Sequence, residues 1–209
     1  MQTIADGAAG FEFDVMLTRD QQPVVVHTPF YSAQIGRMTW HQLQEMGVPH
    51  LREALEIVRT HDIVGILEPK RVSRELMEQI GKLISEYGVL KKIEIISFYS
   101  RRKNLEYIKL FLPDIRCSVI VLNPFTNWVK IANRLKADTV LTGWKGFNYL
   151  TSFTGVIQKR INELRASGIE FGVGIANDAK NIVWASALRP DQLFSDDVKL
   201  TIEIVDEHR

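Results

Sequence analysis

Five residues with ionisable side chains stand on or just after short apolar runs, and their types suit metal-assisted chemistry on an anion. Glu12 and Asp14 are two positions apart, so in a strand their carboxyl groups share one face. Glu68 closes a second apolar run with Lys70 two residues on, and His27 closes a third. Mg²⁺ and Ca²⁺ prefer carboxylate oxygen, and an ammonium group suits a phosphate. The pattern predicts an oxygen-ligand metal site acting on an anion.

Each of these residues also has a plainer interpretation. Glu12 and Asp14 would face water on an edge strand, and Glu68 with Lys70 would form an exposed ion pair. A lone histidine at a strand end, as His27 would be, is usually structural. Two adjacent acids repel, however, so burying both without a cation is costly. Aromatic residues flank this pair and a third acid stands on another strand, which favours the metal site. His27 beside such a cluster becomes a candidate general acid, because imidazole titrates near neutral pH.

Composition predicts one ordinary domain over residues 1–209, since 45% of the residues are hydrophobic and 24% are charged. The net charge of +1 gives no electrostatic footprint for nucleic acid or an anionic membrane surface. No apolar run approaches the roughly 20 residues that span a bilayer, and the first residues lack signal-peptide features. A cytoplasmic location is expected. The single cysteine, Cys117, lies in an apolar run and is expected to be a buried packing residue.

Short apolar runs alternate with amphipathic segments along the whole chain, which favours a parallel sheet covered by helices. Strands are expected at Gly10–Met16, Pro23–His27, Ile63–Lys70, Lys92–Phe98, Arg116–Leu122, Thr139–Gly143, Glu170–Ile175 and Gln192–Ser195. Helices are expected at Trp40–Glu45, Leu51–Thr60, Arg74–Tyr87, Ser100–Leu112, Asn127–Leu135, Thr154–Ser167 and Ala179–Ala187.

The expected fold class is α/β, a (β/α)8 TIM barrel, because polar residues fall toward the C-terminal ends of successive strands. An open doubly wound sheet shares the alternation but uses only the crevice at its switch point. With Pro23–His27 taken as an excursion, seven βα strands remain in a chain shorter than the ~250 residues typical of such barrels. Residues Thr3–Ala9 read as the last turn of a helix whose strand is absent. We expect a barrel of about seven βα units, incomplete at the N-terminus, whose open edges favour self-association.

Several segments resemble the glycerophosphodiester phosphodiesterase family, whose fold is a TIM barrel of the PLC-like phosphodiesterase type. The family block G-A-D-G-(aromatic/aliphatic)-E-x-D-V is matched at Gly7–Val15, and L-T-x-D-x-x-P-V-V-x-H at Leu17–His27. The family's I-P-T-L-E-E-x-L is matched at Val48–Leu55, E-x-K at Glu68–Lys70 and S-S-F at Ile96–Phe98. The matches are collinear and cover nearly the whole chain.

The resemblance implies a role for each candidate residue. Glu12, Asp14 and Glu68 would bind a divalent metal, Mg²⁺ or Ca²⁺, and Lys70 would bind phosphate. His27 would be one of two catalytic histidines and would protonate the leaving alcohol. The implied reaction converts a glycerophosphodiester and water into glycerol phosphate and an alcohol, so the implied partner is a small-molecule phosphodiester.

The chain also departs from the family pattern. The family's first strand carries H-R-G, which supplies the other histidine and a phosphate-binding arginine, and no such motif precedes Glu12. Turnover is therefore expected to be weak or absent, since one acid–base group contributes roughly 10²–10⁴-fold. The late family motif W-T-V-N-D reads Gly174–Asp178 here, which would widen a pocket or simply reflect tight packing. Two alternatives remain: a non-catalytic remnant that binds metal or phosphate, and a phosphodiester transferase or lyase acting on a sugar phosphodiester.

Overall fold

The computed structural model describes residues 2–26, 32–143 and 150–207. The chain divides into two compact units, one formed by Ala9–Arg116 and the other by Met1–Ala8 with Cys117–Arg209. In the described ranges, no helix combines the length and the apolar character needed to cross a membrane.

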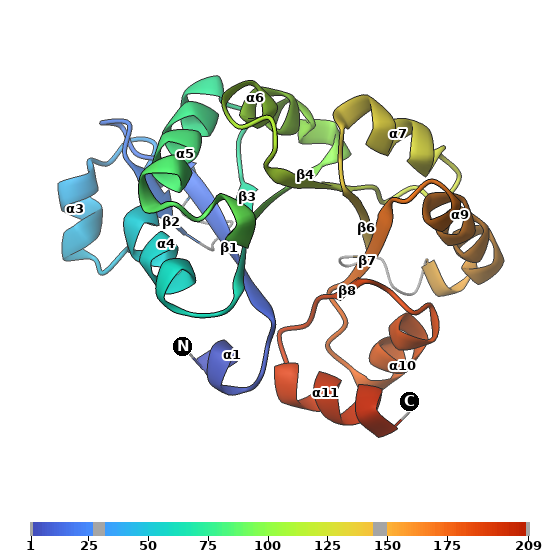
Figure 1. The fold of residues 1–209 in the computed structure, drawn as a ribbon. Coiled ribbons are helices and arrows are strands. Elements are labelled where there is room, and N and C mark those ends of the chain that lie inside the picture. The colour runs from blue at the N-terminus through green and yellow to red at the C-terminus, as the bar shows by residue number, and fades with distance from the viewer. Residues whose placement is uncertain (1, 27–31, 144–149, 208–209) are drawn as a thin grey trace. The chain divides into compact units, whose positions relative to one another are not determined.

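The unit Ala9–Arg116 is a four-stranded sheet with helices packed on it. Its strands are β1 (Gly10–Leu17), β2 (Pro23–Val25), β3 (Val64–Pro69) and β4 (Ile93–Phe98), in the order β2-β1-β3-β4. Its helices are α2 (Ser32–Ile35), α3 (Trp40–Glu45), α4 (Leu51–Thr60), α5 (Arg74–Tyr87) and α6 (Lys103–Phe111), with 3-10 turns η1 (Leu90–Lys92) and η2 (Tyr99–Arg101). Strands β1, β3 and β4 are parallel, whereas β2 runs antiparallel to β1. Figure 1 shows α4, α5 and α6 along one side of these strands.

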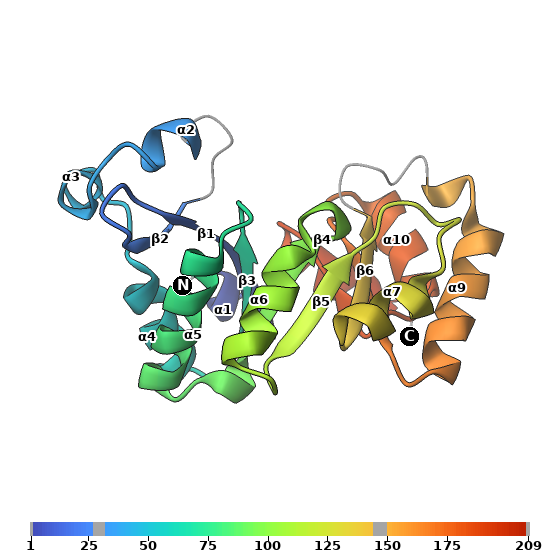
Figure 2. The same cartoon turned by 90° about the horizontal axis from the view of Figure 1, so that it is seen from above.

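The second unit repeats the strand–helix alternation. Its strands are β5 (Arg116–Ile120), β6 (Thr139–Gly143), β7 (Glu170–Gly174) and β8 (Gln192–Leu193), paired in parallel in this order. Its helices are α1 (Gln2–Ala5), α7 (Trp128–Leu135), α9 (Thr154–Ala166), α10 (Ala179–Ala187) and α11 (Val198–Glu207). Figure 2 shows α7 and α9 side by side. An ion pair of 3.3 Å between Lys199 and Asp6 ties α11 to the segment after α1.

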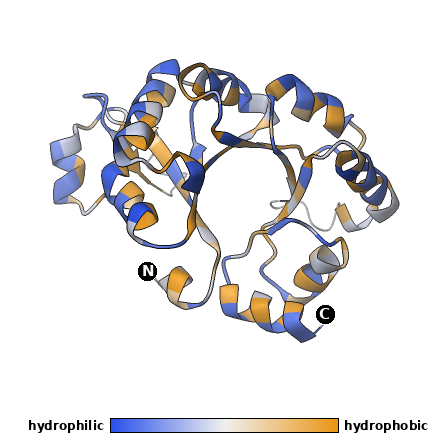
Figure 3. Cartoon of the chain, viewed as in Figure 1, coloured by the Kyte–Doolittle hydropathy of each residue, from blue (hydrophilic) through white to orange (hydrophobic). Residues whose placement is uncertain are grey.

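Amphipathic sequence and local caps explain where the helices form. Helix α5 begins after Ser73, whose hydroxyl accepts the Leu76 N–H at 3.0 Å, and ends at Gly88, whose φ of +65° few other residues adopt. Its apolar residues recur at helical spacing and are buried, including Met77 and Ile80. Figure 3 shows hydrophobic residues along β1 and mixed hydropathy along α4 and α5. The apolar face of α5 is therefore buried within this unit.

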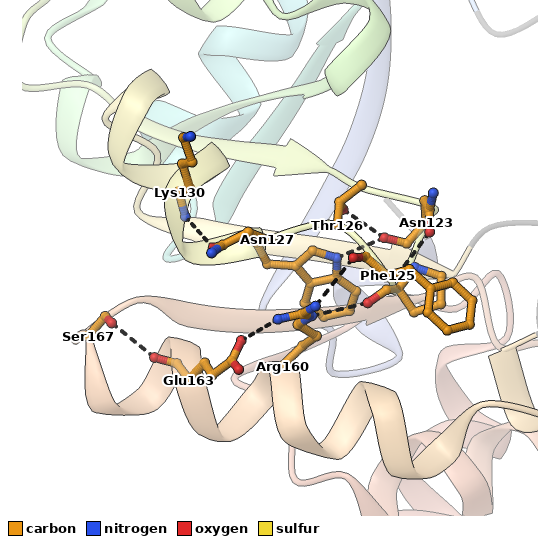
Figure 4. Close-up of polar contacts among 10 residues, drawn as sticks. Asn123, Phe125, Thr126, Asn127, Lys130, Arg160, Glu163 and Ser167 are labelled. Atoms are coloured by element: carbon orange, nitrogen blue, oxygen red, sulfur yellow. Dashed lines mark hydrogen bonds and ion pairs between the residues drawn. The ribbon is translucent and has the colours of Figure 1, made fainter.

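Arg160 of α9 fixes the loop between β5 and α7. Its guanidinium donates to the carbonyl oxygens of Pro124 at 3.2 Å and Phe125 at 3.3 Å, and it pairs with Glu163 at 2.7 Å (Figure 4). A shallow hollow of about 600 Å³ lies beside these contacts. It is lined by Asn127, Val129, Lys130, Asn133, Glu163, Ala166 and Ser167. None of the predicted site residues lines this hollow.

The structure confirms most of the predicted elements and adds two. Pro23–Val25 is the antiparallel excursion expected after the first strand, and four predicted helices have the observed bounds. Helices α2 and α11 were not predicted. Helix α11 has a readable start, because the Asp197 carboxylate accepts the Leu200 N–H at 3.1 Å, and it buries Ile204. The predicted helix at Ser100–Leu112 begins later, at Lys103, because the preceding residues form η2.

His50 begins α4 as an unusual N-cap. The imidazole Nδ1 accepts the backbone N–H of Arg52 at 3.1 Å. The backbone N–H of His50 donates to the Glu53 carboxylate at 2.9 Å, which completes a capping box. The imidazole is 7% exposed and meets the Trp40 ring edge-on. Burial, with a smaller effect of the Arg52 charge, lowers the pKa of His50 below its usual value of 6.5. A protonated Nδ1 could not accept the N–H, so the cap requires the neutral ring.

We expect His50→Asn to flatten the pH dependence of stability. Protonation is disfavoured in the folded protein but not in the unfolded chain, so stability is full above about pH 6.5 and falls as pH drops below it. Asparagine caps helices well and does not titrate, so the variant should stay within about 1 kcal/mol of the wild type at pH 7.5. Urea unfolding from pH 7.5 to 5.0 measures both effects. His41→Asn, at an exposed position of α3, is the control. Parallel pH profiles for wild type and His50→Asn would contradict the cap's role.

Candidate functional site

The parallel register of β1 and β3 sets the position of the three predicted acids. Asp14 lies opposite Glu68, and Glu12 is two residues earlier on the same face of β1. The opposite face of the sheet packs against the helices. Gly65 of β3, three positions before Glu68, points to that face, and a Cβ there would lie 2.7 Å from the Val58 side chain of α4. The three carboxyl groups therefore lie on the sheet face directed away from α4.

The three acids lie close together. One carboxylate oxygen from each of Glu12, Asp14 and Glu68 lies within 4.8 Å of the other two. Asp14 is 2% exposed and Glu68 6%, whereas Glu12 is open to solvent. Oxygens at this separation can bind one ion together.

Lys70 lies directly against two of these acids. Its Nζ is 2.6 Å from Asp14 Oδ1 and 3.0 Å from Glu68 Oε2. Its backbone N–H donates to the Val15 carbonyl at 3.1 Å, which extends the β1–β3 pairing by one residue. The ammonium group is thus held at the carboxylates while about a third of its side chain stays exposed. A cation so placed can meet an anion bound at the same face.

A second cation, Arg101, was not predicted for the site. Its Nη1 donates to Glu68 Oε1 at 3.1 Å, and its guanidinium lies 5.5 Å from the centre of the Phe98 ring. In the sequence it belongs to the run Arg101–Lys103, which reads as an ordinary solvated charge cluster. No local pattern indicates that this arginine, 33 residues after Glu68, reaches it, since the contact depends on β3 and β4 being neighbours.

Two buried polar residues hold the loops that carry these cations. The Asn104 amide donates to the Pro69 carbonyl and accepts the Ser73 N–H, each at 3.3 Å, and so fixes the turn that contains Lys70. The Ser97 hydroxyl donates to the Arg101 carbonyl at 3.2 Å. Both side chains are fully buried, so losing either would leave backbone groups of these turns without these partners.

The electrostatics of the cluster reflect crowded negative charge. Burial, the charge of Asp14, a hydrogen bond with Asp14 and the charge of Glu68 raise the pKa of Glu12 well above its usual value, even though part of the residue meets solvent. Burial also raises the pKa of Glu68, against the opposing effect of Lys70. Burial by itself would lower the pKa of Lys70, but its hydrogen bond to Asp14 and the nearby carboxylates outweigh this effect and raise it. The raised pKa values of Glu12 and Glu68 thus reflect carboxyl groups that are crowded together and partly removed from water.

The remaining predicted features lie elsewhere or cannot be placed. His27 lies outside the described residues. Gly174, where the family motif has tryptophan, is packed tightly against Phe194, the residue after β8: a Cβ there would lie 2.4 Å from Phe194 Cβ. Close packing therefore accounts for this glycine, and a widened pocket is not needed to explain it. Asn177 accepts the Asp196 N–H at 2.8 Å and joins the loops after β7 and β8. Cys117 is buried, as expected.

The donor set fits a hard divalent cation. All three groups offer carboxylate oxygen, which suits Mg²⁺ and Ca²⁺ and suits softer metals poorly. Buried carboxylates need a compensating charge, and Lys70 and Arg101 supply it in the structure. The fold and site are therefore those of an α/β protein with carboxylates clustered on parallel strands beside two cations.

Comparisons with known proteins identify the family. The sequence model of the "Glycerophosphoryl diester phosphodiesterase family" matches residues 1–200, and the chain belongs to this family of phosphoric diester hydrolases. None of the curated protein sequences compared with it matches.

Solved structures agree on the fold. A glycerophosphodiester phosphodiesterase from Parabacteroides distasonis has a TM-score of 0.82 at 21% identity, over 99% of this chain and 87% of its own. The Oleispira antarctica phosphodiesterase solved with its product sn-glycerol-3-phosphate has a TM-score of 0.80 at 18% identity, over 97% and 87%. The glycerophosphodiester phosphodiesterase from Thermotoga maritima has a TM-score of 0.75 at 19% identity, over 97% and 88%. The expected α/β fold of the TIM-barrel type is confirmed.

We expect Ca²⁺ or Mg²⁺ to raise the unfolding temperature through the acidic cluster. An ion at 100 times its dissociation constant stabilises the folded state by about 2.7 kcal/mol, or roughly 5–10 °C for a chain of this size. Asp14→Asn should abolish the shift, because it removes a ligand charge. Glu56→Gln, an exposed acid on α4 of the same unit, should keep it. Differential scanning calorimetry with each ion and with EDTA measures the shifts, and equal shifts in both variants would exclude this cluster as the binding site.

Proposed function

We propose that this protein is a metal-dependent glycerophosphodiester phosphodiesterase, which hydrolyses a glycerophosphodiester to glycerol phosphate and an alcohol. The observation that carries the proposal is the convergence of Glu12, Asp14 and Glu68 on one sheet face with Lys70 against them. Membership of the family supports the reaction class. The Oleispira antarctica relative, solved with sn-glycerol-3-phosphate, supports glycerol phosphate as the product.

The proposed roles follow from charge and position. The three carboxylates would hold Mg²⁺ or Ca²⁺, which when bound offsets negative charge on the phosphoryl oxygens in the transition state. Lys70 would place an ammonium group on the same phosphate and bind it by charge-assisted hydrogen bonds. The buried carboxylates keep Lys70 protonated, because their charges raise its pKa. Binding and orientation of the phosphate group are therefore the tasks of residues on β1 and just after β3.

Proton transfer requires a group near the leaving oxygen. His27 is proposed as the general acid that protonates the leaving alcohol. The sequence has no H-R-G motif before Glu12, the segment in which the family carries its other catalytic histidine. Slow turnover therefore stays a prediction, as does self-association, which light scattering can test. A non-catalytic binding protein and a lyase or transferase are the competing functions.

We expect phosphorus NMR to detect slow, metal-dependent release of glycerol phosphate from glycerophosphoethanolamine. Lys70→Met should lower the rate by about 10²–10³-fold, the usual effect of removing one preorganised group aimed at developing negative charge. Glu12→Gln should lower it at least as much by weakening ion binding. Glu56→Gln is the matched control and should retain the wild-type rate.

Each competing function has its own result in the same spectra. A cyclic phosphate product would indicate a lyase. Metal binding by the wild type without turnover, with every glycerophosphodiester tried, would indicate a binding protein. Turnover that is independent of Glu12 and of added metal would contradict the proposed site.

A further inference from the structure

Arg101 is built into the acidic site more firmly than an incidental surface arginine. Its guanidinium donates to Glu68 Oε1 at 3.1 Å and lies over the Phe98 ring, while the buried Ser97 hydroxyl holds its backbone carbonyl. These contacts anchor the backbone of Arg101 and place its head group beside the acidic cluster.

The neighbouring Arg102 provides a comparison, because its guanidinium contacts Tyr99 of the same turn and not an acid of the cluster. Its guanidinium lies 5.1 Å from the centre of the Tyr99 ring and donates to the Tyr99 carbonyl at 3.4 Å. Arg102 thus has the same charge and a similar aromatic contact, but it packs against its own turn. The two arginines form a matched pair for experiment.

Both oxygens of Glu68 are held by cations in the structure. Arg101 contacts Oε1, and Lys70 contacts Oε2 at 3.0 Å while also meeting Asp14. A divalent ion at the cluster must share Glu68 with these two cations, which repel it. A phosphate group offers them other oxygens, with which a guanidinium forms strong bidentate hydrogen bonds. With 37% of its side chain exposed, Arg101 has room to turn toward such a group.

We propose that Arg101 exchanges Glu68 for the phosphate group of the ligand, so that divalent ion and phosphate each strengthen binding of the other. The inference rests on the proposed function, because it takes Glu12, Asp14 and Glu68 as the ion site. When phosphate draws Arg101 away, Glu68 gains a free oxygen for the ion. When the ion occupies Glu68, Arg101 becomes available to phosphate. Coupling between two sites is reciprocal, so each ligand must raise the affinity of the other by the same factor.

The test is calorimetric titration of Ca²⁺ and of Mg²⁺ with and without sn-glycerol 3-phosphate. For the wild type we expect glycerol phosphate to tighten ion binding by a factor within the usual coupling range of about 5–150. In Arg101→Leu, the ion alone should bind more tightly than in the wild type, because one competing cation is gone. Glycerol phosphate should bind more weakly, and the coupling factor should fall at least threefold. Arg102→Leu should match the wild type in all three quantities.

The direction in which Arg101→Leu changes the affinity for the ion alone separates the proposed exchange from a merely structural role of Arg101. If Arg101 merely orients Glu68, Arg101→Leu will weaken binding of the ion alone, and that result overturns the proposal. An unchanged coupling factor overturns it as well. Arg101→Gln, which keeps a polar side chain over Phe98, repeats the test if the leucine variant does not fold. If the wild type binds neither ion, the proposed function fails together with the inference, whereas ion binding without coupling removes the inference alone.

Discussion

The concentration of negative charge on one face of β1 and β3 is the constraint around which the site is built. Three carboxyl groups supply oxygens within 4.8 Å of one another, and two of the residues are almost fully buried. An uncompensated buried charge costs several kcal/mol, so the fold must bring cations to Asp14 and Glu68. Lys70 and Arg101 meet this need from the turns after β3 and β4. The same pairing that stabilises the acids places two cations beside the proposed ion site.

Two buried polar side chains hold the turns that bear these cations. Asn104 of α6 holds the turn after β3, and Ser97 at the end of β4 holds the turn with Arg101. These contacts lie beneath the ionic residues, in surroundings where a hydrogen bond is stronger than in water. The turns that carry the two cations are therefore held by Asn104 and Ser97, which bond to the backbone. The positions of Lys70 and Arg101 therefore depend on buried residues that carry no charge themselves.

Relatives with 18–21% identity share this fold at TM-scores of 0.75–0.82. Such likeness with so few identical residues shows that the fold depends on where apolar, polar and turn residues fall, and less on which of them is used. Helix α5 illustrates this, because a serine cap, a buried apolar face and a glycine in the left-handed conformation are enough to define it. The proposed site differs from the fold in this respect. The roles proposed for Glu12, Asp14, Glu68 and Lys70 require a carboxylate or an ammonium group at each position.

The sequence by itself determined the strand–helix alternation, the approximate position of most elements and the pairing of Glu12 and Asp14 on one face. These features follow from local periodicity, which a single segment carries. It did not reveal the short helix α2, the helix α11 or the contact of Arg101 with Glu68. Only the tertiary structure decided that Arg101 meets Glu68 and that Asn104 fixes the turn after β3. These contacts join residues more than 30 positions apart, and they exist because parallel pairing brings the ends of successive strands to one edge of the sheet.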